Sequence, residues 1–155
     1  IGILQMMHHP FKIMALSLLS AISFSACSYL PTTSPSPIKQ LEHVQNIEAL
    51  PNTKANIATL SQSKNDCLIQ FTGYFDAGES TETWRFKANQ LRHGFSETYQ
   101  YDVNSAIDVA TQRHKLDQKT RTITVFDVQS DETKHNFEKL KSHFSQTALA
   151  QCHSI

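Results

Sequence analysis

Alternation of apolar and polar residues between residues 67 and 101 constrains the fold more than any other feature of this chain. Apolar or small residues occupy every second position from Cys67 to Phe75, and the alternation returns around Trp84 and Phe86 and again over 91–101. This period of two is typical of strands that bury one face. Because the links between the three runs are short, the strands must pair antiparallel.

Turn-forming residues separate the three alternating runs. Residues 76–80 form the first turn, and Asn89-Gln90 forms a tighter second link. Gly94 falls inside the third run, where we expect it to mark a β-bulge.

Residues 104–119 fit two structures. Ser105 suits the start of a helix, whereas Ile107 and Val109 alternate as in a strand that leads into a hairpin turn at Asp117-Gln118. We favour the strand and keep the helix as the alternative.

The C-terminal part predicts one more strand and then a helix. Residues 122–128 are rich in β-branched side chains, and Ser130 is a suitable N-cap ahead of Asp131 and Glu132 in the first turn. The helix is expected to end near residue 149 or 151. Its apolar face would consist of Phe137, Leu140, Phe144 and Ala148.

Residues 38–66 carry a weaker pattern. Apolar residues recur at every third position from Ile38 to Leu50, which favours a helix, and residues 53–63 fit a second short helix. A loosely packed arm remains equally open. The sequence thus predicts an α+β domain over residues 67–155, with an antiparallel sheet of four to five strands packed against a C-terminal helix.

The N-terminal segment has the pattern of a signal peptide. Translation is expected to begin at Met6 or Met7, so residues 1–5 or 1–6 would not be translated. A weakly basic stretch that ends at Lys12 precedes the uncharged residues 13–24. This run is too short for a membrane-spanning helix, which needs about 20 apolar residues.

The run Phe24-Ser25-Ala26-Cys27 resembles the lipobox of bacterial lipoproteins. The resemblance implies that residues 1–26 are removed and that the Cys27 sulfur receives a diacylglyceryl group, with acylation of the new amine. Several acyl chains would hold the protein firmly at a membrane. Ser28 in place of Asp implies sorting to the outer membrane, with the domain facing the periplasm.

Residues 27–37 have the composition of a tether. Three Pro and five Ser or Thr residues fall within residues 28–37. Such a segment favours an extended spacer that lifts a domain away from lipid head groups.

The charge balance argues against nucleic acid as a partner. Lys and Arg total 14, Asp and Glu total 14, and the formal net charge is zero. A nucleic-acid binder needs a basic surface to neutralise phosphates. With nucleic acid excluded, the expected partners are the membrane, through the lipid that the lipobox resemblance implies, and a protein of the envelope.

The two cysteines of the expected domain, Cys67 and Cys152, are predicted to form a disulfide, because an exported protein meets an oxidising compartment. A redox pair or metal thiolates are the alternatives, but no C-x-x-C spacing supports them. No two of the histidines beyond the expected signal peptide stand three or four residues apart as on one helix face. We therefore expect neither a metal nor another cofactor.

Aromatic residues concentrate in the predicted sheet. Trp84, Phe95 and Tyr99 are candidate ligand contacts, although such residues also form the core between a sheet and a helix. The sequence contains no G-x-S-x-G motif, and its carboxylates are scattered, so no catalytic residue is assigned.

These observations predict a non-enzymatic, lipid-anchored interaction or envelope-assembly module. The alternative is a lipoprotein that binds a small lipid, glycan or peptide in an aromatic pocket. A small hydrolase is a third hypothesis, which requires carboxylates or histidines that converge in a cleft.

Overall fold

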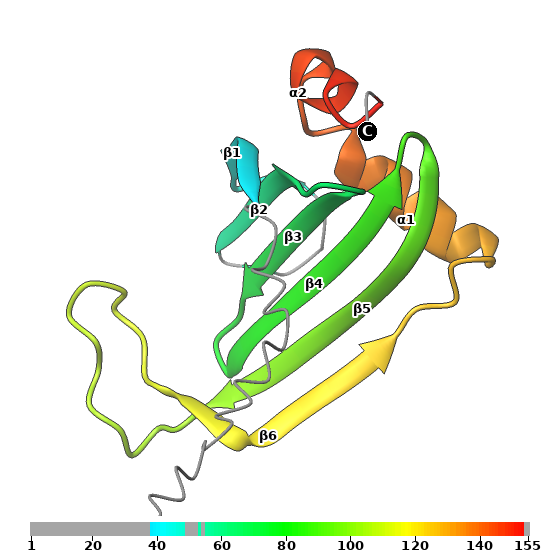
Figure 1. Ribbon diagram of the computed structural model, residues 1–155. Helices are drawn as coiled ribbons and strands as arrows, with labels where there is room; N and C mark the ends of the chain where they lie inside the picture. The colour runs from blue at the N-terminus through cyan, green and yellow to red at the C-terminus, as the bar shows by residue number, and fades with distance from the viewer. Residues whose placement is uncertain (1–37, 49–52, 54, 154–155) are drawn as a thin grey trace, which may run out of the picture. The chain divides into compact units, whose positions relative to one another are not determined.

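The structure is a computed structural model that describes residues 38–48, 53 and 55–153 (Figure 1). Six strands pair antiparallel in sequence order, each with the next. The α+β class is confirmed, but the sheet has six strands rather than four to five. The elements are β1 (Lys39–Gln45), β2 (Ala55–Gln62), β3 (Cys67–Tyr74), β4 (Gly78–Lys87), β5 (Gln90–Tyr101), β6 (Leu116–Val125), α1 (Asp131–Lys141) and α2 (Gln146–Ala150).

The predictions for the signal peptide, the lipidated Cys27 and the tether over 27–37 fall outside the described residues. Among the described residues, no helix has the length and apolarity that crossing a membrane requires.

Strands β3, β4 and β5 correspond to the three alternating runs, and Ala88-Asn89 forms the tight link between β4 and β5. The β-bulge of β5 lies at Arg92, not at Gly94 as predicted. Gly94 instead lies opposite Trp84, and a Cβ atom there would come within 2.9 Å of the Phe126 ring. Glycine at this position therefore makes room for aromatic rings.

The helices predicted within residues 38–66 are replaced by strands β1 and β2. The register of β1 on β2 shifts between Gln40 and Glu42, so Leu41 is an extra residue in a bulge. This bulge, followed by the left-handed Asn46, turns the alternation of a strand into an apparent period of three. In β2 the alternation is intact, with Ala58 and Leu60 both fully buried.

Residues 102–115 form a loop, which corrects the prediction of a strand over 104–119 with a turn at Asp117-Gln118. An isolated bridge joins Asp108 to Arg113, and Asp117 and Gln118 lie within β6. The alternating Ile107 and Val109 are both exposed. An alternating pattern does not show whether another element packs against the apolar side chains, so it predicted a strand here.

The C-terminal helix begins as predicted. The Ser130 side chain accepts a hydrogen bond from the backbone N–H of Thr133 at 3.1 Å, and Asp131 and Glu132 lie in the first turn. All four side chains of the predicted apolar face are buried, but only Phe137 and Leu140 belong to α1; Phe144 lies in the break after it and Ala148 in α2.

The helix is interrupted earlier than predicted, because α1 ends at Lys141 and α2 begins at Gln146. Ser145 caps α2 by accepting a hydrogen bond from the Ala148 N–H at 3.2 Å. The Glu42 carboxylate accepts two hydrogen bonds from Ser145, at 2.9 Å from the backbone N–H and at 2.8 Å from the hydroxyl. The break thus turns the chain so that α2 reaches β1.

One face of the sheet carries the core, and we call it the covered face because α1 and α2 lie on it. Phe137 of α1 packs against Phe86 and Trp84, with ring centroids 5.3 Å and 5.9 Å away. We call the opposite side the open face. The buried apolar residues are Ala58, Leu60, Cys67, Ile69, Phe71, Trp84, Phe86, Phe137, Leu140, Phe144, Ala148, Leu149 and Cys152.

The predicted disulfide between Cys67 and Cys152 is confirmed. Their α-carbons lie 5.8 Å apart, and both residues are buried. The bond joins the start of β3 to the turn after α2, across 85 residues of chain.

Replacing both cysteines, Cys67→Ser with Cys152→Ser, is expected to lower the free energy of unfolding by about 4 to 5 kcal/mol, because the cross-link restricts the unfolded chain. Denaturant unfolding of the oxidised protein and of the variant measures this change. The far-ultraviolet circular dichroism spectrum should stay native-like. Equal unfolding midpoints for the variant and the oxidised wild type would contradict this role of the bond.

Candidate functional site

The three predicted ligand contacts lie on two different faces of the sheet. Trp84 is buried on the covered face, whereas Phe95 pairs with Thr83 and Tyr99 pairs with Glu79 on the open face. These three side chains therefore do not line one common pocket.

The bulge at Arg92 causes this separation. Around the link, Phe86 pairs with Leu91, and that register would place Phe95 on the face of Trp84. One extra residue in β5 shifts the register, so that Trp84 pairs with Gly94 and Phe95 moves to the open face.

On the open face, the end of β6 exposes two aliphatic side chains. Ile123 is 49% exposed and Val125 is 67% exposed. Phe95, which pairs with Val125, is half-buried beside them. An ion pair between Arg121 and Glu97 continues this surface along β5 and β6. The result is an apolar strip next to a neutralised charge pair.

Strand β6 is also an edge strand, since β5 is its only neighbour among the strands of residues 38–48, 53 and 55–153. The backbone N–H of Phe126 donates to the carbonyl of Gly94 at 2.8 Å, which fixes the pattern of the ladder. In an antiparallel pair, alternate residues point their backbone groups toward the neighbouring strand. The N–H and C=O groups of Ile123 and Val125 therefore point away from β5, toward the free edge.

A loop over residues 102–115 projects from the end of β5 and β6 (Figure 1). It exposes three more aliphatic side chains, Val103 at 73%, Ile107 at 54% and Val109 at 86%.

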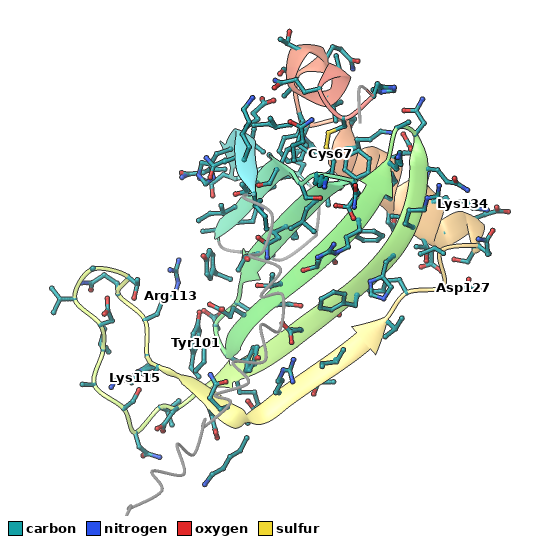
Figure 2. The ribbon with its side chains drawn as sticks, viewed as in Figure 1. Cys67, Tyr101, Arg113, Lys115, Asp127 and Lys134 are labelled. Atoms are coloured by element: carbon teal, nitrogen blue, oxygen red, sulfur yellow. A yellow bond between two sulfur atoms is a disulfide. The ribbon has the colours of Figure 1, made fainter. Side chains whose placement is uncertain are left out.

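Hydrogen bonds and a ring contact hold this projecting loop in place. The Asp102 N–H donates to the Lys115 carbonyl and the Asp108 N–H donates to the Arg113 carbonyl, each at 2.8 Å. The Arg113 guanidinium lies 3.7 Å from the centre of the Tyr74 ring. The loop is therefore an ordered projection, and Figure 2 labels Arg113 and Lys115 within it.

Two ionisable groups beside the base of the loop have shifted pKa values. Burial raises the pKa of Glu79, and the nearby Arg113 opposes this shift. Burial also raises the pKa of Tyr101, with a further contribution from the Glu79 charge. The Tyr101 hydroxyl is enclosed and has no hydrogen-bond partner within the described part of the chain.

The covered face contains a groove of about 550 Å³ between α1 and the strands beside it. Glu82 of β4 lines it, two residues before Trp84 and on the same face. The Trp84 indole N–H donates to the Glu82 carboxylate at 2.9 Å. Burial raises the pKa of Glu82, and this hydrogen bond opposes the shift.

Sequence reasoning did not single out Glu82, although the pattern contained a clue. Residues two apart on a strand share a face, so an acid two positions before a core tryptophan must be partly buried. The exposed Ile123 and Val125 of β6 were missed because the sequence cannot show which strand forms the edge, whereas Ile107 and Val109 of the loop were assigned to a strand.

The two carboxyls with raised pKa values, Glu79 and Glu82, lie on opposite faces of the sheet. They cannot act on one substrate as the paired acid and base of a glycosidase do. Over residues 38–48, 53 and 55–153, no group of three His, Cys, Asp or Glu side chains is placed to hold a metal ion. Glu79 and Glu82 therefore do not form a catalytic pair.

Comparisons with protein-family models, with curated protein sequences and with solved structures find no match to this chain.

Replacing Glu82 by Gln is expected to raise the melting temperature at neutral pH. Because the folded-state pKa is raised, the folded protein holds this proton more tightly than the unfolded chain, and stability falls as pH rises above the ordinary value of 4.5. Gln stays neutral and keeps an oxygen for the Trp84 N–H. The gain should vanish well below pH 4.5, where Glu82 is protonated. A variant that melts lower at neutral pH would contradict this account.

Proposed function

We propose that the protein is a non-enzymatic interaction module, anchored by lipid on Cys27 to the outer membrane of a bacterial envelope, and facing the periplasm. Residues 28–37 act as its spacer. The lipobox resemblance supports the anchor, and the fold supports a docking function. The observation that carries this function is the free β6 edge with exposed Ile123 and Val125 beside it.

The partner is a protein that contributes an extended segment to the sheet. The outward backbone groups of Ile123 and Val125 would bond to that segment, as in other strand-addition complexes. Its alternate apolar side chains would cover Ile123, Val125 and Phe95 on the open face. Long apolar edge strands are normally protected by proline, lysine or a cover. Over 122–125 the sequence is Thr-Ile-Thr-Val, with no such protection.

The projecting loop is not part of this docking surface. Its exposed Val103, Ile107 and Val109 precede Leu116, where β6 begins, whereas Ile123 and Val125 lie at the other end of that strand.

Lipidation is tested by changing the modified residue. Cys27→Ala should abolish incorporation of radioactive palmitate and leave an uncleaved precursor, because the acyl chain is attached to that sulfur. Labelling of immunoprecipitated protein in growing cells measures this, with Cys67→Ala as a control that should still be labelled. Equal labelling of the Cys27→Ala variant would remove the anchor from the proposal.

Docking at the β6 edge is tested by photo-crosslinking in cells. A photoreactive amino acid at Thr122 should give a discrete crosslinked product, and one at the exposed Lys64 should not. Adding Val125→Pro should reduce that product about tenfold or more, because proline removes an outward N–H from an edge strand without breaking the ladder to β5.

The matched control for this experiment is Val125→Thr, which keeps the N–H and the β-branched shape. The Val125→Thr variant should retain more of the crosslinked product than Val125→Pro does, and the two variants should have similar melting temperatures. A product that is unchanged by Val125→Pro, or equally strong from Lys64, would refute docking at this edge.

A further inference from the structure

The groove on the covered face has the size of a small-molecule site. Its volume of about 550 Å³ lies within the range of known ligand pockets, roughly 300 to 1,000 Å³. Its lining combines one carboxylate in the sheet, two aromatic residues and a mixed polar rim from α1. The residues that matter here are Glu82, Trp84, Phe126, Asp127, Glu132, His135 and Lys139.

Glu82 is the polar group within the sheet part of this groove. Its Oε2 accepts the indole N–H of Trp84 at 2.9 Å, which fixes the orientation of the carboxylate. Among the described residues, no Lys, Arg or His forms an ion pair with it. A partly buried carboxylate without a cationic partner is costly, and a ligand that carries a positive charge would offset that cost.

Two aromatic rings lie beside this carboxylate. The ring centroids of Trp84 and Phe126 are 4.7 Å apart and their planes are tilted by 33°. The missing side chain at Gly94 lets both rings come close to the sheet. Aromatic faces, that of tryptophan above all, attract organic cations.

The rim has a negative balance. Asp127 and Glu132 add two carboxylates to that of Glu82, against one lysine, Lys139, and the weakly basic His135. Charge complementarity therefore favours a cationic ligand over an anion.

We propose that this groove binds a small organic cation, an amine or a quaternary ammonium compound, with its charge against the Glu82 carboxylate and the Phe126 ring. Trp84 is only 3% exposed and holds that carboxylate in place. The donor set does not suit a metal ion, because the described residues place no three metal-ligating side chains together there. The groove borders the β6 docking surface, because Val125 also lines it. The two functions are told apart by Glu82, which lies on the opposite face of the sheet from Phe95 and Ile123 and belongs to the groove alone.

The test uses the fluorescence of Trp84, the single tryptophan of the chain. The purified exported protein is titrated with choline and with n-butylamine. The matched neutral probes are the carbon isostere of choline and n-butanol. At least one cation should give a saturable change in emission, and its neutral match should bind about tenfold more weakly or worse, because it lacks the charge. No saturable response to either cation, or equal affinity for the neutral match, overturns the proposal.

Variants assign the response to the carboxylate. Glu82→Gln keeps the shape and the hydrogen bond from Trp84, and it should weaken binding of the cation about tenfold or more. Glu79→Gln neutralises a carboxyl whose pKa is also raised by burial but which lies on the open face, so it should leave the affinity unchanged. Equal losses in both variants, or none in Glu82→Gln, would contradict a cation held by Glu82. Melting curves confirm that each variant is folded.

Discussion

The packing of Phe137 against Trp84 and Phe86 is the contact on which the rest of the structure depends. It places α1 across one part of the covered face, and the Cys67–Cys152 bond ties the following turn to the start of β3. The helix covers Trp84 but leaves Glu82, two residues earlier on the same strand, at the side of a groove. Because both α1 and α2 lie on the covered face, the aliphatic side chains of the open face and the β6 edge stay exposed.

The sequence predicted the elements whose pattern is purely local. Strands β3 to β5 followed from unbroken alternation, and the start of α1 followed from the capping by Ser130. Strand β1 was mistaken for a helix because the bulge at Leu41 disturbs the alternation. The loop over 102–115 was mistaken for a strand because its alternating aliphatic residues face solvent, and burial depends on tertiary structure that one sequence does not reveal.

The candidate sites were less predictable than the fold. The disulfide followed from the number of cysteines and the expected compartment, and its geometry agrees. Trp84 and Phe95 were expected to share a ligand, but one extra residue at Arg92 puts them on opposite faces. A register shift of one residue always moves every following side chain to the other face of the sheet. The position of a bulge depends on both strands, so it could not be read from β5 alone.

Strand β6 presents outward backbone groups beside exposed aliphatic side chains, and the proposed docking depends on them. Amide hydrogen exchange of the isolated protein, resolved by residue with nuclear magnetic resonance, tests this arrangement most directly. We expect fast exchange at the Ile123 and Val125 amides and slow exchange at Thr122 and Thr124, whose N–H groups point toward β5. Slow exchange at Ile123 and Val125 in the monomeric protein would mean that this edge is already covered, and would refute docking there.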